Sequence, residues 1–453
     1  MTIQLTPRRP AAPPARPARD SRRLPLLALL VFLAMLPLEW ITLAGVQEGF
    51  VKPFHVAALG LIIVGLARWR PRRLLAPVLT RYSVVYVGYA VVLGAAFFGG
   101  LTYADPYLSR AEVFRNCFYL LTSVVVAGVV VGLLARPPRA GLAWAGVTTL
   151  ATLLFALVTA LAAQRLNPFA IIADALIQQD PDIISRQLLR SAFRTDAGLD
   201  DAAPNLRHKV FGGLLVAVFL GLACRSLVDR RRTALRAVLT AGGVLGCMAV
   251  VLSLSRSITV CVVVTLALFP LRSVIMNRVR PLRAAVAALA VLVIGVLAVS
   301  PVGQLVFTRF GDTGSYEARL QAAGPSFLEQ FIPAAVLGTT NTAVETAPHN
   351  LVLNSWLAGG VLAAIAAALM IVFLLRLWLG QAFRYLTGRP GWVLPVSQAW
   401  VLGVGIIPLV RSVTSGSLFH MVEWTAIGIF LGVLLANERA ARSLNAGSDG
   451  ASR

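Results

Sequence analysis

Residues 235–271 read LRAVLTAGGVLGCMAVVLSLSRSITVCVVVTLALFPL. A helix that crosses the hydrocarbon core of a membrane needs about 20 mostly apolar residues, so this stretch is too long for a single crossing. The polar run Ser253-Leu254-Ser255-Arg256-Ser257 interrupts it near its middle. We therefore predict two antiparallel helices, 235–252 and 258–271, joined by a tight turn with Arg256 at its tip.

The composition of the whole chain also indicates a membrane environment. Of its 453 residues, 58% are hydrophobic and 13% are charged, and the mean hydropathy is +0.78. Soluble domains carry about 25% charged residues, roughly twice the density found here. A chain this apolar has too much hydrophobic surface for a soluble core, so lipid must form part of its solvent.

The apolar residues lie in long blocks separated by polar segments. Lipid offers the backbone no hydrogen-bond partner, so only helices and closed barrels cross a membrane, and blocks rich in Leu, Ala and Val favour helices. We predict an all-α, polytopic helical membrane protein with about twelve transmembrane helices. The blocks are 24–38, 54–67, 82–101, 117–134, 141–163, 210–228, 235–252, 258–271, 284–302, 351–375, 392–410 and 417–436.

The distribution of charge predicts the orientation of these helices. With the N-terminus in the cytoplasm, most of the 41 Lys and Arg residues lie in inner segments and most of the 19 Asp and Glu residues in outer segments. This asymmetry follows the positive-inside rule, so both termini are expected in the cytoplasm. The net charge of +22 is then explained by inner loops facing anionic membrane lipids, and no nucleic-acid partner is required.

The chain divides into a membrane domain and two tails. Residues 1–23 are rich in Pro, Ala and Arg and are expected to form a disordered, basic cytoplasmic tail. The membrane domain covers 24–436, and 437–453 form the second cytoplasmic tail. Within the membrane domain, the outer segments 164–209 and 303–350 are longer than a connection needs, which is typical of functional loops.

The first of these outer segments has two features. Residues 183–193 mix apolar and basic positions at helical spacing, which predicts an amphipathic helix on the outer surface. The acidic pairs Asp180/Asp182 and Asp200/Asp201 carry the oxygen ligands that divalent cations prefer. Solvated loop charges are the simpler interpretation of both pairs, and no metal site is predicted.

Several arginines and one histidine are expected to meet at the outer membrane interface. Guanidinium groups offer planar, bidentate donors to phosphate and stay charged. An imidazole with an ordinary pKa near ~6.5 is neutral at working pH and accepts a proton. The candidate residues are Arg256, Arg309, Arg319, Arg411, Glu345 and His349.

At these residues the sequence resembles the O-antigen ligase/polymerase superfamily, the membrane glycosyltransferases that act on polyprenyl-diphosphate-linked glycans. The Ser-Leu-Ser-Arg256-Ser turn looks like the Ser-Arg element of the family. His349-Asn350, followed after nine residues by Gly360, looks like the ligase signature, although Ala363 stands where Gly, Thr or Tyr is expected.

A further segment extends this resemblance. Arg319-Leu320, followed by Pro333 and Leu337-Gly338, looks like a periplasmic helical segment of the family. The resemblance implies a GT-C-like fold with helical periplasmic loop segments in a bacterial inner membrane. It also implies a metal-independent, inverting ligase of lipopolysaccharide biosynthesis that needs no cofactor.

The resemblance further implies a role for each candidate residue. The donor would be a glycan linked to undecaprenyl diphosphate, and the acceptor would be a hydroxyl of lipid A–core on the periplasmic side. Negative charge develops on the leaving diphosphate, and fixed cations stabilise it. The implied roles are His349 as base, Glu345 as its orienter, and Arg256, Arg319, Arg309 and Arg411 as diphosphate ligands, with His349, Arg256 and Arg319 catalytic.

Other functions fit the same sequence. A polymerase that joins repeat units, or a protein O-oligosaccharyltransferase, would use the same chemistry on another acceptor. A metal-dependent membrane glycosyltransferase would use one of the two acidic pairs. A secondary transporter is the alternative of another class, but transporters place ionisable residues within the membrane, and the predicted spans contain no Asp or Glu near their middle.

Overall fold

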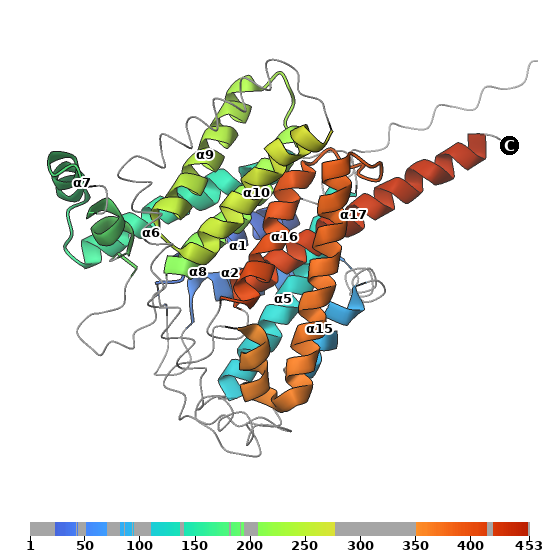
Figure 1. The fold of residues 1–453 in the computed structure, drawn as a ribbon, viewed down its shortest axis with the longest axis horizontal. Helices are drawn as coiled ribbons and strands as arrows, with labels where there is room; N and C mark the ends of the chain where they lie inside the picture. The colour runs from blue at the N-terminus through green and yellow to red at the C-terminus, as the bar shows by residue number, and fades with distance from the viewer. Residues whose placement is uncertain are drawn as a thin grey trace, which may run out of the picture.

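The computed structural model describes residues 23–41, 43, 51–69, 82–85, 87–92, 94, 110–135, 140–180, 183–190, 192–193, 207–276, 350–414 and 420–451. Helices are the regular structure of this part of the chain, and it contains no β-strand. The α-helices, arranged as in Figure 1, are α1 (Arg23–Met35), α2 (Pro53–Arg68), α5 (Arg110–Leu134), α6 (Ala145–Ala163), α7 (Pro168–Ile177), α8 (Arg207–Cys224), α9 (Thr233–Leu252), α10 (Arg256–Ile275), α15 (Leu351–Thr387), α16 (Gln398–Ser412) and α17 (Met421–Ala451).

Seven helical segments among the described residues are long and apolar enough to cross a membrane. They are Arg115–Leu134, Gly141–Ala163, Lys209–Leu227, Thr233–Leu252, Arg256–Ile275, Gly359–Thr387 and Met421–Ala446. The predicted all-α class is confirmed, whereas the twelve predicted crossings are not. The predicted spans at 24–38, 54–67, 82–101 and 392–410 correspond to shorter apolar helices, and 284–302 lies outside the described residues.

The predicted hairpin of α9 and α10 is present with nearly the predicted boundaries. Helix α9 ends at Leu252, and α10 begins at Arg256 and continues to Ile275, four residues beyond the predicted end. In the turn, Leu254 adopts a left-handed backbone conformation with φ of 53°. The Ser253 hydroxyl donates to the Val250 carbonyl and accepts the Ser255 N–H, so local hydrogen bonds fix the turn.

Helix α15 is broken near its start, which moves the predicted tenth span. Gly360 has φ of 74° and ψ of −171°, a backbone conformation essentially restricted to glycine. Figure 1 shows a short limb and a long limb that run in opposite directions from this break. The crossing helix is therefore Gly359–Thr387 rather than the predicted 351–375, and the glycine of the predicted signature is the point of reversal.

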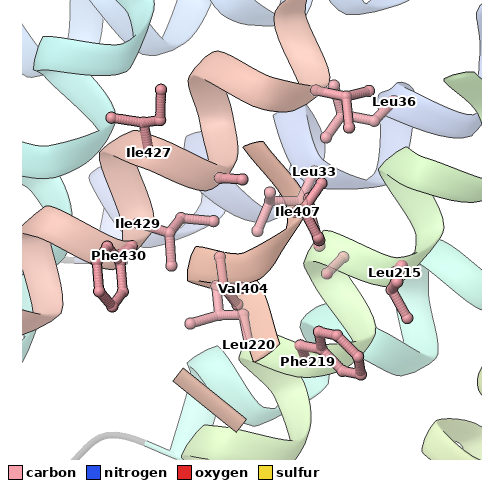
Figure 2. Close-up of a cluster of buried hydrophobic side chains, with 14 of the residues drawn as sticks. Leu33, Leu36, Leu215, Phe219, Leu220, Val404, Ile407, Ile427, Ile429 and Phe430 are labelled. Carbon is pink, nitrogen blue, oxygen red and sulfur yellow. The ribbon is translucent and has the colours of Figure 1, made fainter. Parts of the chain in front are cut away.

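The core is built around α8 and α17, the two most enclosed of the spanning helices. Figure 2 shows their side chains packed with those of α1 and α16, among them Leu33, Phe219, Ile407 and Phe430, all nearly inaccessible. The outer helices α6, α9, α10 and α15 instead carry many exposed apolar side chains. Such a surface is expected of helices that face lipid.

Small residues allow α17 to lie directly on the backbone of α5. A β-carbon at Gly428 would lie 2.5 Å from the carbonyl oxygen of Ser123, and one at Gly432 would lie 2.8 Å from that of Ala127. Gly428 and Gly432 thus form a Gly-x-x-x-Gly pair on one helix face, the pattern that permits close packing of helices in membranes.

We expect Gly428→Val to destabilise the protein by about 1–3 kcal/mol, because backbone atoms of α5 cannot move aside as a flexible side chain would. Thermal unfolding of the purified protein in detergent measures this effect. Gly380→Val on α15 is the matched control, since a β-carbon there meets nothing within 4 Å. Equal melting temperatures of the two variants would contradict the close packing of α5 and α17.

Candidate functional site

The first residues of α8, α10 and α17 come together at one end of the helix bundle, which we call the Arg256 end. A β-carbon at Gly212 of α8 would lie 3.2 Å from Val422 Cγ1 of α17 and 3.4 Å from Ile258 Cδ1 of α10. Arg256 is the first residue of α10 and is half-buried beside the buried Ser255. Two of the predicted site residues, Arg256 and Arg411, lie at this end.

Arg411 forms a buried ion pair. It lies at the end of α16, and its Nε donates to Oε1 of Glu423, in the first turn of α17, at 2.7 Å. The side chains are only 6% and 2% exposed. The second oxygen of Glu423 accepts the backbone N–H of His420 at 3.0 Å. Glu423 therefore neutralises Arg411 and fixes the plane of its guanidinium.

This pairing leaves part of the guanidinium available. Within the described residues, Nη1 and Nη2 of Arg411 have no hydrogen-bond partner, because only Nε contacts Glu423. The two Nη groups form an edge that matches two oxygens of a phosphate. The geometry therefore permits Arg411 to hold a second anion while it remains paired with Glu423.

A second charged cluster, which we call the Glu39 cluster, consists of Glu39, Lys52 and Lys209. Glu39 follows the short helix Leu36–Leu38, Lys52 precedes α2, and Lys209 is in the first turn of α8. Both Nζ atoms lie 3.5 Å from the same carboxylate oxygen, Oε1 of Glu39. Burial is the main cause of the lowered pKa of Lys52; Glu39 raises this pKa, and Lys209 and Arg115 lower it further.

His55 holds the backbone at Lys52. The ring Nδ1 of His55 accepts the backbone N–H of Lys52 at 3.1 Å, and the backbone N–H of His55 donates to the Lys52 carbonyl at 3.0 Å. With Nδ1 as an acceptor, the neutral ring carries its proton on Nε2, which then donates to the Tyr119 hydroxyl at 3.1 Å. Both ring nitrogens are thus engaged, and His55 serves to position the start of α2.

The remaining predicted site residues, which are His349, Arg309, Arg319 and Glu345, lie outside the described residues. The structure does describe Asn350, the second residue of the predicted signature. Its side-chain oxygen accepts the N–H groups of Val352 at 2.8 Å and Leu353 at 3.3 Å, which caps the short limb of α15. Figure 1 shows this limb at the Arg256 end of the bundle. His349 directly precedes this cap in sequence.

The predicted outer segment 164–209 is described in part. Helix is present at Ile184–Arg190, within the predicted amphipathic segment, where Leu189 is buried and Arg186 is exposed. Asp180 pairs with Arg186 at 3.1 Å, whereas Asp182, Asp200 and Asp201 lie outside the described residues. Among the residues that are described, no three His, Cys, Asp or Glu side chains are grouped as metal ligands.

Sequence reasoning missed Glu423 and the Glu39 cluster. Glu423 could have been found, because it is an acidic residue inside the apolar block 417–436, and ionisable residues in such blocks are usually paired and functional. Glu39, Lys52 and Lys209 each lie just beyond an apolar block. Nothing in their spacing indicates that they contact one another.

Comparison of the sequence with models of protein families gives no match, and comparison with curated protein sequences gives none either.

Proposed function

We propose that the protein transfers a glycan from a polyprenyl-diphosphate-linked donor to an acceptor hydroxyl at the extracytoplasmic face of the bacterial inner membrane. The proposal rests on one observation above all, the convergence of Arg256 and Arg411 at one end of a helical bundle. Helix α10 packs on α16, and α16 packs on α17, so these two arginines belong to adjoining helices. The resemblance of 253–257 and 349–360 to the O-antigen ligase superfamily supplies the reaction class.

In this reaction the bond between the sugar C1 atom and the diphosphate oxygen breaks, and a bond from the acceptor oxygen to C1 forms. The electron pair of the broken bond goes to the diphosphate, where Arg256, Arg319, and Arg309 or Arg411 stabilise the added charge. The acceptor proton goes to His349, which Glu345 orients. The attack comes from the face opposite the leaving group, so the configuration at C1 is inverted.

Glu423 contributes to this mechanism by fixing Arg411 before the donor binds. A guanidinium already held in its plane loses little conformational freedom when its Nη edge meets a phosphate. The ion pair also keeps this cation in place when no donor is bound. Arg411 is therefore pre-organised for the leaving group, and no metal ion is required in the proposed mechanism.

The glycans of a strain that lacks the gene test the proposal. Accumulation of lipid-linked polymer that is not attached to lipid A–core is expected for a ligase. Single repeat units attached to the acceptor would instead indicate a polymerase. Loss of glycan from proteins would indicate a protein O-oligosaccharyltransferase. Unchanged glycans would contradict the proposal and favour a secondary transporter. Activity of the purified protein should persist in EDTA, whereas activity restored only by Mg²⁺ or Mn²⁺ would contradict the metal-independent mechanism.

We expect Arg256→Lys to lower the rate of glycan transfer by about 100-fold, because an ammonium cannot replace the bidentate contact of a guanidinium. The rate is measured with purified protein in liposomes that contain the lipid-linked donor. Arg231→Lys is the matched control, because Arg231 is exposed in the α8–α9 connection, far along both helices from the Arg256 end. Full activity of Arg256→Lys would exclude a bidentate role for Arg256.

A further inference from the structure

Lysine is used in only one place in this protein. Of the 41 Lys and Arg residues in the chain, two are lysines, Lys52 and Lys209, and all others are arginines. These two lysines are far apart in the sequence, yet their Nζ atoms lie 3.5 Å from the same oxygen of Glu39. The compact ammonium group, which carries three rotatable donors, therefore occurs only in the Glu39 cluster.

The positive charge of this cluster exceeds its negative charge. Two ammonium groups share one carboxylate, and no other carboxylate of the described residues forms an ion pair with either lysine. Both contacts are long, since hydrogen bonds between ammonium and carboxylate groups are typically about 2.7–2.9 Å. One carboxylate oxygen thus holds two cations loosely, and each ammonium retains donors for a further acceptor.

Two features favour the approach of an anion to the two lysines. The lysine side chains are 17% and 16% exposed, whereas the Glu39 side chain is 8% exposed, so solvent reaches the lysine side chains more than the glutamate. Lys52 immediately precedes α2, and Lys209 lies in the first turn of α8. Both lysines are therefore next to the positive ends of helix dipoles, which add to the attraction for an anion.

We propose that Lys52 and Lys209 form an anion site, composed of residues other than the arginines of the proposed glycan-transfer site, and that this site binds a phosphate group. Phosphate suits two ammonium groups because its oxygens accept hydrogen bonds from both at once. Burial is the main cause of the lowered pKa of Lys52, and the neighbouring cations Lys209 and Arg115 lower this pKa further. The phosphate belongs either to the headgroup of an anionic lipid or to a soluble or substrate phosphate. This inference does not depend on the proposed transfer reaction.

Binding of inorganic phosphate to the purified full chain in uncharged detergent at low salt tests the proposal. A ligand that binds only the folded protein raises its melting temperature in a saturable manner. We expect the apparent dissociation constant to rise at least tenfold in Lys52→Gln and in Lys209→Gln, and binding to disappear in the double variant. Arg231→Gln removes an exposed cation elsewhere and should bind phosphate as the unchanged protein does. Equal titrations of the double variant and the unchanged protein would overturn the proposal.

Glu39→Gln provides a second variant if the lysine variants do not fold. It removes the carboxylate that competes with phosphate for the two ammonium groups, so phosphate should bind more tightly. If the salt bridge were purely structural, Glu39→Gln would be less stable and would not bind phosphate more tightly. That result would overturn the proposal. Tighter binding by Glu39→Gln would support it.

The source of the phosphate is determined by repeating the titration in nanodiscs. If phosphatidylglycerol nanodiscs abolish the effect of inorganic phosphate while phosphatidylcholine nanodiscs preserve it, the site binds the headgroup of an anionic lipid. If the effect of phosphate is the same in both lipids, the site binds a soluble or substrate phosphate. A lack of phosphate binding in detergent and in both lipids would overturn the proposal.

Discussion

The His349→Ala variant is expected to fold normally and to lose glycan transfer almost completely. General-base catalysis contributes about 100- to 10,000-fold, and the proposed mechanism assigns the acceptor proton to His349 alone. The initial rate of transfer from a lipid-linked donor by the purified variant measures the loss. Because His349 directly precedes the Asn350 cap, the variant retains the side chain that holds the short limb of α15.

A matched variant and a rescue experiment separate the role of a base from a structural role. His208→Ala removes another histidine of the predicted outer segments and should leave the rate nearly unchanged. Added imidazole should restore part of the activity of His349→Ala, since a small base can enter the space left by the side chain. Wild-type transfer by folded His349→Ala would remove this residue from the mechanism.

The largest effect on stability is expected for Glu423→Leu. This change leaves the Arg411 guanidinium buried without its partner, and loss of one member of a buried ion pair typically lowers stability by about 3–5 kcal/mol. Unfolding of the purified variant by heat or by denaturing detergent measures the change. Asp174→Leu is the control, because Asp174 is exposed on α7 and forms no ion pair with the described residues.

The double variant Arg411→Met/Glu423→Leu shows whether the loss of stability comes from the unpaired charge of Arg411 or from the loss of the Glu423 side chain itself. Replacement of both members by apolar residues removes the uncompensated charge, so most of the lost stability should return. Transfer should remain impaired in this variant, because the cation proposed to contact the diphosphate is absent. A Glu423→Leu variant as stable as the unchanged protein would contradict the importance of the ion pair.

The hairpin of α9 and α10 shows what can be predicted from local sequence. Two apolar blocks separated by Ser253–Ser257 specify two helices and a turn, because in lipid each helix satisfies its own backbone hydrogen bonds. The same reasoning located the helices near 117–134, 141–163 and 210–228. It failed for 351–375, because an apolar block does not reveal a backbone reversal that two adjacent glycines permit at Gly359 and Gly360.

The candidate site was predicted only in part. Sequence patterns singled out Arg256 and Arg411, and the structure describes both at one end of the bundle. The sequence patterns did not indicate that Arg411 is paired with Glu423. The assigned roles of His349, Arg309, Arg319 and Glu345 remain predictions.

The sequence by itself determined that this chain is helical and apolar enough for a membrane, and where several of its helices begin and end. These properties follow from neighbouring residues, because helical hydrogen bonds join residues four positions apart. Only the tertiary structure decided which charges meet, as Glu39 does with Lys52 and Lys209, and Arg411 with Glu423. Ion pairs between different helices depend on how those helices pack, and packing joins residues that no local pattern connects.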